Sequence, residues 1–387
     1  MTADAVLYLA SPDDLRAARL SLAGRPLAFR VVMAAVRAGA RRVAVPAVLR
    51  DAALEAAIAR TPSARRAVEW LAPDTTAPAA PIVLLPAGTL VTVATVSVLV
   101  MAPPAAIVAG AAHGAPVAAA APATIAPLWR ALSGGEPVGA EIARALAAAR
   151  AIEIPAAGIV ERVASADADD AAATVAETRL LGTLGSPIDT AFDRAFHRRL
   201  SAPVTRWAVE RGVTANAITI ASIVVGLFAA VAVAVDGLAG VVIGVGLYVA
   251  AVVLDHADGE VARVGFAESR LGEWLDIGGD TAVHTALVLA MGTAAHRASG
   301  AAGWLGAVAA IGVIGSAWVM KTSPPRADPV GRVFLALGNR DGFYAMLLAF
   351  LAALALLPAA LPALMVLLAA GTHAYWLGSL FARLRRS

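Results

Sequence analysis

Apolar residues are distributed unevenly along the chain, and the longest apolar runs lie in its second half. From about residue 217 onward, several runs approach the roughly 20 residues that a helix needs to cross a bilayer. Two of the separating segments are short and contain glycine or proline, so tight antiparallel hairpins are expected there. The pattern predicts six transmembrane helices, at 217–235, 239–257, 280–296, 301–320, 342–357 and 360–381.

The first 180 residues follow another pattern, in which alanine-rich helical stretches alternate with short β-branched runs. The run 81–102 has the length of a membrane span. However, proline and glycine interrupt it and valine and threonine dominate it, which is typical of buried parallel strands. The alternation of strands and helices predicts a soluble α/β domain of Rossmann type. Strands are expected at 6–9, 42–45, 82–85 and 97–101.

A third pattern precedes the first apolar run, at residues 189–212. Large apolar side chains recur at helical spacing opposite arginines, which predicts an amphipathic helix in the headgroup layer of a bilayer. An ordinary solvated linker helix remains the alternative. The apolar positions are Phe192, Phe196, Leu200, Val204 and Trp207, and the basic ones are Arg198, Arg199 and Arg206.

Composition narrows the class of protein. Of the 387 residues, 59% are hydrophobic, and the mean hydropathy of +0.75 is too high for an ordinary soluble protein. The absence of cysteine excludes disulfides, thiolate metal sites and a cysteine nucleophile. Basic residues do not cluster with aromatic ones, so nucleic-acid binding is not expected. The first residues show no signal-peptide pattern either.

Basic residues are concentrated on one side of the predicted spans. They precede the first span, follow the second and the fourth, and end the chain, whereas the opposite side contains only Arg297. By the positive-inside rule, both termini and the segment after the second span face the cytoplasm. We therefore expect a multi-pass protein of the cytoplasmic (inner) membrane.

Four carboxylates lie close together in the sequence at the end of the second predicted span and before the third. Asp255 and Asp258 are three residues apart, and Asp276 and Asp280 are four apart, so each pair shares one face of its own helix. Two antiparallel helices could direct all four into one space. Such an all-oxygen site suits one or two hard divalent cations, Mg²⁺ or Mn²⁺, and acids at a membrane edge indicate function.

The residues between these acids suit a phosphate ligand. Gly259 and Ala262 are small enough for a ligand to approach the helix backbone. Arg263 carries a planar fork of donors for phosphate oxygens. Together with bound metal, these features indicate phosphoryl transfer from a nucleotide-activated substrate. A polar network in a transporter or channel, or loop acids without a special role, would be the alternatives.

The spacing of these residues, D-x2-D-G-x2-A-R-x8-G-x3-D-x3-D, resembles the signature of the CDP-alcohol phosphotransferases (CDP-alcohol phosphatidyltransferases). These are integral-membrane enzymes of phospholipid and inositol-phosphodiester synthesis. The resemblance implies metal-dependent transfer of a substituted phosphate group from a CDP-alcohol, of the CDP-diacylglycerol or CDP-inositol type, to an acceptor alcohol, with release of CMP. It also implies a homodimer. The matching positions are Asp255, Asp258, Gly259, Ala262, Arg263, Gly272, Asp276 and Asp280.

The resemblance further implies roles for individual residues. Asp255, Asp258 and Asp276 would hold metal, and Asp280 would complete a second metal site and act as general base. The family usually has proline before Asn216, where this chain has Ala215. The residues implied for nucleotide binding are Asn216, Thr219, Gly259, Ala262, Arg263, Ser269 and Gly272.

Basic residues at the cytoplasmic helix ends are candidates for holding a phosphorylated acceptor such as inositol phosphate. Topology and snorkelling alone would also place basic residues there. His284, one turn beyond Asp280, is expected to be a hydrogen-bonded histidine of the helix bundle. The candidate acceptor-binding residues are Lys321, Arg332, Arg340 and Arg383.

The N-terminal part, around Gly24-Arg25-Pro26, resembles a sugar nucleotidyltransferase domain, as in the fusions of inositol-phosphate cytidylyltransferase with di-inositol-phosphate phosphate synthase. Active relatives have a glycine-rich loop after the first strand, but here no glycine occurs before Gly24. Active relatives also have a metal-binding aspartate on their middle strands. Residues 75–129 of this chain contain no Asp, Glu, Lys or Arg, so that aspartate is missing here. We therefore expect a degenerate domain with a structural, scaffolding or regulatory role.

These patterns divide the chain into a cytoplasmic nucleotidyltransferase-like domain (1–180), a linker with the juxtamembrane helix (181–216) and a six-helix membrane domain (217–387). Two other functions stay open. A transporter with a cation site would need polar residues at mid-membrane, and the predicted spans contain few. A non-catalytic membrane scaffold would not need all eight signature residues, which are present.

Overall fold

In the computed structural model, the described residues are 4–103, 106–108, 114–164, 169–184, 193–235, 237–300, 303–322 and 340–384. The chain forms two compact units, Met1–Leu184 and Gly185–Ser387. Each unit has its own core, and the two are described separately.

The first unit is built on a seven-stranded mixed sheet with the order β10-β8-β9-β6-β1-β4-β5. Strands β1, β4, β5 and β6 run parallel, β9 is antiparallel to both of its neighbours, and β10 is parallel to β8. The bounds are β1 (Asp4–Tyr8), β4 (Val43–Pro46), β5 (Val68–Leu71), β6 (Ile82–Pro86), β8 (Ala106–Val108), β9 (Ala118–Ala120) and β10 (Arg150–Ile152).

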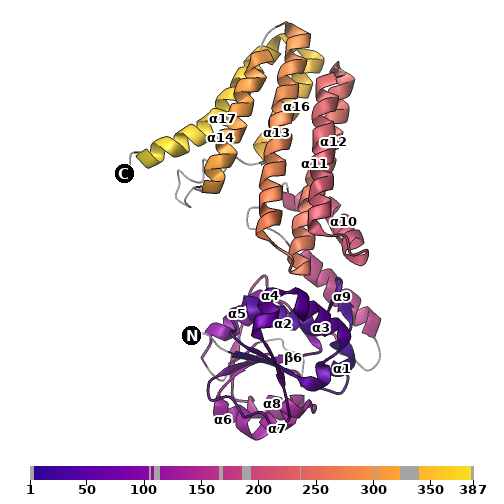
Figure 1. Cartoon of the computed structure of the whole chain (residues 1–387), viewed down its shortest axis with the longest axis vertical. Coiled ribbons are helices and arrows are strands. Elements are labelled where there is room, and N and C mark those ends of the chain that lie inside the picture. The colour runs from indigo at the N-terminus through magenta and orange to yellow at the C-terminus, as the bar shows by residue number, and fades with distance from the viewer. Residues whose placement is uncertain are drawn as a thin grey trace. The chain divides into compact units, whose positions relative to one another are not determined.

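Two antiparallel ribbons accompany this sheet, β2 (Ser21–Leu22) with β3 (Arg25–Pro26) and β7 (Thr89–Val91) with β11 (Val160–Arg162). Helices cover both faces of the sheet (Figure 1). They are α1 (Asp14–Ala17), α2 (Leu27–Arg37), α3 (Ala52–Arg60), α4 (Pro62–Ala67), α5 (Val93–Met101), α6 (Pro122–Ile125), α7 (Trp129–Gly134), α8 (Gly139–Ala145) and α9 (Asp169–Gly182), with the 3₁₀ turns η1 (Ala47–Leu49) and η2 (Ala126–Leu128).

The core of this unit follows from the apolar strand sequences. Tyr8 and Leu84 from the central strands pack with Trp129, Leu132 and Ile142 from the helices that follow β9. The α/β layer that the sequence predicts is therefore present, and the predicted strands 6–9, 42–45 and 82–85 agree with β1, β4 and β6 to within a few residues.

The predicted strand 97–101 is wrong, because these residues belong to helix α5. Valine and threonine favour strands only weakly, and tertiary packing overrides this preference. Helix α5 buries Thr95, Val96 and Leu99, and the hydroxyl of Thr95 donates to the carbonyl of Ile159 at 3.1 Å. The prediction of buried parallel strands in the run 81–102 is correct for β6, which pairs in parallel with β1, although β6 also pairs with the antiparallel strand β9.

A polar contact anchors helix α9 to the rest of the first unit. The carboxylate of Glu177 accepts from the backbone N–H of Ala23 at 2.9 Å, a residue with a φ of 45°. The buried guanidinium of Arg30 donates to the carbonyls of Leu22 and Ala23, and burial lowers the pKa of Arg30 to about 9. These contacts fix the turn between β2 and β3.

The second unit is helical. A π-helical turn η3 (Asp193–His197) leads into α10 (Arg198–Glu210), and longer helices follow. They are α11 (Ala215–Val235), α12 (Gly237–Gly265), α13 (Arg270–Ser299), α14 (Gly303–Thr322), α16 (Arg340–Leu356) and α17 (Leu361–Leu384), with the 3₁₀ turn η4 (Pro358–Ala360) before α17.

Four helical segments of the described residues are long and apolar enough to cross a membrane: Ala215–Val235, Gly237–Gly265, Gly303–Thr322 and Pro358–Gly378. Helix α13 contains the predicted span 280–296 but is not among these four, and the apolar part of α16, Gly342–Leu356, is shorter than a span. The structure thus supports a multi-pass membrane protein with four of the six predicted spans.

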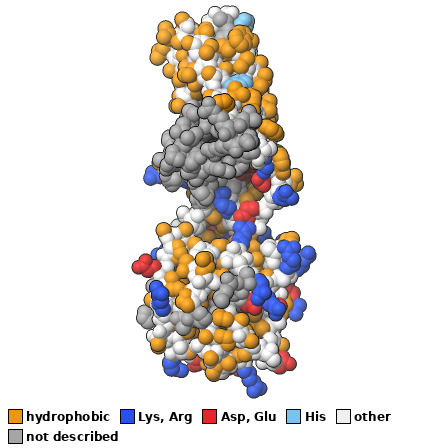
Figure 2. Space-filling model, turned by 90° about the vertical axis from the view of Figure 1, so that its left-hand side faces the viewer, with side chains coloured by type: hydrophobic (Ala, Val, Ile, Leu, Met, Phe, Trp, Pro, Cys, Tyr) orange, Lys and Arg blue, Asp and Glu red, His pale blue; other side chains and the backbone are white. Residues whose placement is uncertain are grey.

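Close helix packing in this unit depends on small residues. Helices α13 and α14 approach at Gly292 and Gly306, where a Cβ on Gly292 would lie 2.8 Å from the Cα of Gly306. Such contacts are typical of helices that associate in a membrane. On the face that Figure 2 shows, the surface of this unit is largely apolar, and its charged side chains gather toward one end.

Candidate active site

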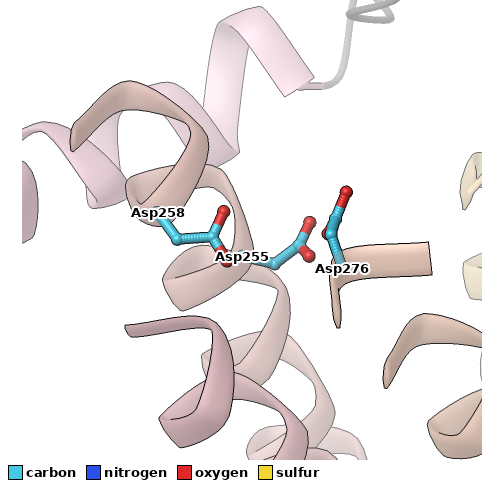
Figure 3. A group of neighbouring side chains, drawn as sticks. All are labelled: Asp255, Asp258 and Asp276. Atoms are coloured by element: carbon cyan, nitrogen blue, oxygen red, sulfur yellow. The ribbon is translucent and has the colours of Figure 1, made fainter. Parts of the chain in front are cut away.

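Three of the four predicted acids meet in space. Asp255 and Asp258 lie one turn apart on α12, and Asp276 approaches them from the first turns of α13 (Figure 3). One carboxylate oxygen of each lies within 4.8 Å of the others. The convergence that the spacing predicts for these three residues is therefore present.

The fourth acid, Asp280, lies one turn further along α13 and outside this group of three. It lines a small cleft together with Asp255 and Asp276, and with Tyr248 and His284 deeper in the bundle. The cleft has a volume of about 10 Å³, which is room for about one water molecule. Asp280 is thus placed beside the acid group rather than within it.

The three acids form a set that can hold a hard divalent cation. Asp258 is only 6% exposed, and its buried Oδ2 atom accepts no hydrogen bond from the described residues. Like charges this close together repel one another, and a buried carboxylate oxygen without a partner is costly. A bound Mg²⁺ or Mn²⁺ ion would offset the repulsion between the carboxylates and provide a partner for this oxygen, because such ions prefer oxygen ligands.

The glycine and arginine of the signature lie together on α12. A Cβ built on Gly259 would lie 3.0 Å from Nη1 of Arg263. The guanidinium therefore extends back along the helix toward the turn that carries Asp258. A larger residue at position 259 would displace this guanidinium.

Three predicted nucleotide residues meet at the start of α13. The Ser269 hydroxyl accepts from the backbone N–H of Gly272 at 3.0 Å, so this serine is the N-cap of α13. A Cβ on Gly272 would lie 3.1 Å from Oδ1 of Asn216 and 3.2 Å from Oγ of Ser269. Asn216, Ser269 and Gly272 therefore form one polar corner, in which a Cβ at position 272 would be in tight contact with two oxygen atoms. Nearby on α11, the hydroxyl of Thr219 donates to the carbonyl of Ala215 at 3.1 Å.

Residues 212–380, which include all of these positions, match the model of the CDP-alcohol phosphatidyltransferase family. This part of the chain is a CDP-alcohol phosphatidyltransferase domain. The family indicates phosphotransfer from a CDP-alcohol to an acceptor alcohol. The mixed sheet of the first unit is consistent with a nucleotidyltransferase-like domain. No curated protein matches the chain.

One candidate acceptor residue of the phosphatidyltransferase domain already has partners. The Lys321 ammonium forms an ion pair with Glu273 on α13 and lies 5.0 Å from the ring centroid of Trp274. The hydrogen bond from Lys321 holds the pKa of the Glu273 carboxyl below its usual range. Arg332 lies outside the described residues, as do the side chains of Arg340 and Arg383.

A tyrosine that the sequence analysis does not single out contacts His284 beneath the acids. The hydroxyl of Tyr248 lies 2.8 Å from Nε2 of His284, and Nδ1 of His284 lies 2.7 Å from the backbone carbonyl of Asp280. Since a carbonyl only accepts, Nδ1 carries the proton and Nε2 accepts from the tyrosine. This pair joins α12 to α13. Tyr248 precedes Asp255 by seven residues, two helical turns, a spacing that could have indicated it.

A further residue missed by sequence reasoning lies within the signature itself. Glu260 is 4% exposed and faces α10, where its carboxylate accepts from Arg198 at 2.5 Å, from Ser201 at 2.8 Å and from Thr205. The polar face of α10 is therefore buried against α12. Leu200 and Trp207 of α10 are exposed, as is Phe196 in the preceding turn η3, and exposed apolar side chains are expected of an amphipathic surface helix. Val204 packs inward, and Phe192 lies outside the described residues.

Proposed function

We propose that the phosphatidyltransferase domain catalyses the metal-dependent transfer of a substituted phosphate group from a CDP-alcohol to an acceptor alcohol, with release of CMP. The observation that carries this proposal is the convergence of Asp255, Asp258 and Asp276 from two helices, within 4.8 Å of one another. They converge beside a cleft that Asp280 also lines.

The CDP group is proposed to bind along the start of α11, the end of α12 and the start of α13. Arg263, aligned over Gly259, can donate to phosphate oxygens. The corner of Asn216, Ser269 and Gly272 brings two side-chain oxygens close to a backbone that carries no side chain. The full proposed set is Asn216, Thr219, Gly259, Ala262, Arg263, Ser269 and Gly272.

Asp280 is the proposed general base. It accepts the proton of the acceptor hydroxyl while that oxygen forms a bond to the β-phosphorus of the CDP-alcohol. The bond between this phosphorus and the bridging oxygen breaks, and CMP leaves with the electron pair. Divalent metal, held by Asp255, Asp258 and Asp276 with Asp280 completing a second site, would neutralise charge on the diphosphate.

The acceptor is proposed to bind at the basic helix ends. Lys321, Arg332, Arg340 and Arg383 would hold a phosphorylated acceptor such as inositol phosphate. Lys321 would then exchange its ion pair with Glu273 for an acceptor phosphate. The donor would be of the CDP-diacylglycerol or CDP-inositol type, and the product a phospholipid or an inositol phosphodiester.

For the whole chain, we propose six spans, with parts of α13 and α16 added to the four apolar segments. Both termini and the acid site would face the cytoplasm, in the inner membrane, because basic residues dominate that side. The domain is proposed to work as a homodimer. Residues 1–180 are proposed to be a nucleotidyltransferase-like domain without transferase activity.

The test is CMP release by the purified full-length protein from a panel of CDP-alcohols and acceptors, with Mg²⁺ and with EDTA. At least one donor–acceptor pair is expected to yield CMP and the coupled product with Mg²⁺ but not with EDTA. Equal release with EDTA would contradict a metal-dependent reaction. Release of CMP without a coupled product from every pair would contradict transfer to an alcohol.

A further inference from the structure

The strand order in the sheet of the first unit reverses next to β1. From β1 the chain continues to β4 and β5 on one side and then returns to β6 on the other side of β1. In open α/β sheets, ligands bind at this point, beyond the carboxyl ends of the strands. In this sheet that position, the crevice of the fold, lies between the segment after β1, Leu9 to Asp14, and the residues Ala87 and Gly88 after β6.

The carboxylate of Asp14 lies in this crevice and is completely buried, with 0% exposure. Its Oδ2 atom accepts from the backbone N–H groups of Ala10 at 2.9 Å and Gly88 at 3.2 Å. Its Oδ1 atom accepts from the hydroxyl of Ser11 at 3.1 Å and from the guanidinium of Arg162. Converging amides, a hydroxyl and an arginine are the donors with which proteins bind phosphate.

Arg162 reaches the crevice from a distant part of the chain. It ends β11, which pairs with β7 just after Gly88. Its guanidinium also donates to Ser11 at 2.9 Å and to Thr89 at 3.3 Å. The arginine is thus fixed from both sides of the crevice, and its charge offsets that of the buried carboxylate.

The carboxylate also fills the space between the two loops. A Cβ on Gly88 would lie 2.9 Å from both Cγ and Oδ1 of Asp14, so this backbone approaches the carboxylate as closely as glycine allows. The donors of an anion site are all present, and the chain's own acid occupies them.

We propose that Asp14 is an internal substitute for a ligand phosphate and closes the crevice of the first unit, so that this unit binds neither phosphate nor nucleotide. The missing glycines after β1 are then only part of the reason for its expected inactivity. The backbone N–H groups of Ala10 and Gly88 still converge on an anion, but this anion is the carboxylate of Asp14 in the same chain. This inference does not depend on the activity proposed for the second unit.

Hydrogen–deuterium exchange of the full-length wild-type protein, read by mass spectrometry, tests the closure directly and assigns any binding to one unit. Peptides that contain Ala10 and Gly88 are expected to exchange slowly and at the same rate with and without inorganic phosphate or CTP. Slower exchange of these two peptides with either ligand would overturn the proposal.

The substitution Asp14→Ala should open the site, with Asp13→Ala as the matched control. In the Asp14→Ala protein, the two peptides are expected to exchange about tenfold faster or more, because each amide loses a charged acceptor. Inorganic phosphate should then slow them again, and it should have no effect in the Asp13→Ala protein. Exchange in Asp14→Ala that phosphate does not slow would overturn the proposal.

If Asp14→Ala does not fold, Asp14→Asn serves in its place, because it keeps the size of the side chain and removes its charge. Faster exchange of the same peptides is expected, since the neutral amide is a weaker acceptor for Arg162 and the backbone. Exchange as slow as in the wild type would overturn the role of the charge.

Discussion

At the scale of single residues, the acid site combines two kinds of side chain. Some face the cleft, such as Asp255, Asp276 and Asp280, and others fix those residues from behind. Arg263 is not among the residues that line the cleft; its guanidinium lies over Gly259, next to the turn that carries Asp258. Tyr248 lines the cleft as well. It also belongs to the second kind, because its hydroxyl is hydrogen-bonded to His284, which donates to the backbone carbonyl of Asp280.

Arg263→Ala should weaken CDP binding by roughly 1.5–3 kcal/mol, the scale of a hydrogen bond to a charged group. The measurement is equilibrium CDP binding to the purified protein with Mg²⁺. Arg206→Ala, which removes an exposed arginine of α10, is the matched control and should bind CDP as the wild type does. Unchanged affinity in Arg263→Ala would place the nucleotide elsewhere.

Tyr248→Phe should lower Mn²⁺ affinity or the rate of CMP release by about tenfold, because groups that orient metal-binding residues typically contribute 10–100-fold. Tyr344→Phe is the matched control. It removes a hydroxyl from a ring that lies 5.1 Å from that of Tyr248, and it leaves the hydrogen bond between Tyr248 and His284 in place. Mn²⁺ binding and CMP release equal to the wild type in Tyr248→Phe would show that this hydrogen bond does not position the acids.

At the scale of secondary-structure elements, the site depends on how α10, α11, α12 and α13 are held together. Helix α12 presents Asp255 and Asp258 toward α13 and Glu260 toward α10. Two faces of the same segment of α12 thus contact two different helices, α13 and α10. Helix α10 is consequently attached to the part of α12 that carries the signature residues.

Glu260→Ala should destabilise the protein by about 3–5 kcal/mol, because it removes the carboxylate that pairs with the largely buried cation of Arg198. Glu260→Gln should cost less, since an amide oxygen still accepts from the hydroxyls of Ser201 and Thr205. Thermal unfolding in detergent measures both, with Glu210→Gln on α10 as control. A melting temperature of Glu260→Ala equal to that of the control would contradict the assignment.

Sequence patterns predict elements better than the contacts between them. The three-residue spacing of Asp255 and Asp258 predicts their shared face, and the short apolar runs predict β1, β4 and β6. The direction of β9 and the helical state of 97–101 depend on packing between distant segments, which local patterns do not encode. The same holds for Glu260, whose partner Arg198 lies 62 residues earlier, on α10.

At the scale of the whole molecule, the chain joins two units with separate cores. The second unit contains the acid group and all residues proposed for catalysis. The first unit has a mixed sheet that is consistent with a nucleotidyltransferase-like domain, and the carboxylate of Asp14 occupies the donors at its crevice. Catalysis is therefore expected to reside in the second unit alone.

The fragment 186–387 should accordingly dimerise and release CMP, with lower stability than the full chain. Size-exclusion chromatography with light scattering and the CMP assay measure this, with the full-length protein as reference. A folded fragment without activity would show that the first unit contributes to the reaction.

The most direct test of the central claim is the rate of Mg²⁺-dependent CMP release by Asp276→Asn and Asp280→Asn in the full-length protein. Asp74→Asn, an exposed aspartate of the first unit, is the matched control. Both site variants are expected to remain folded and lose about a hundredfold or more of the rate, the scale of a positioned acid–base or metal-binding group, while the control keeps it. Retention of more than about a tenth of the rate in both site variants would contradict the account, since such groups usually contribute far more.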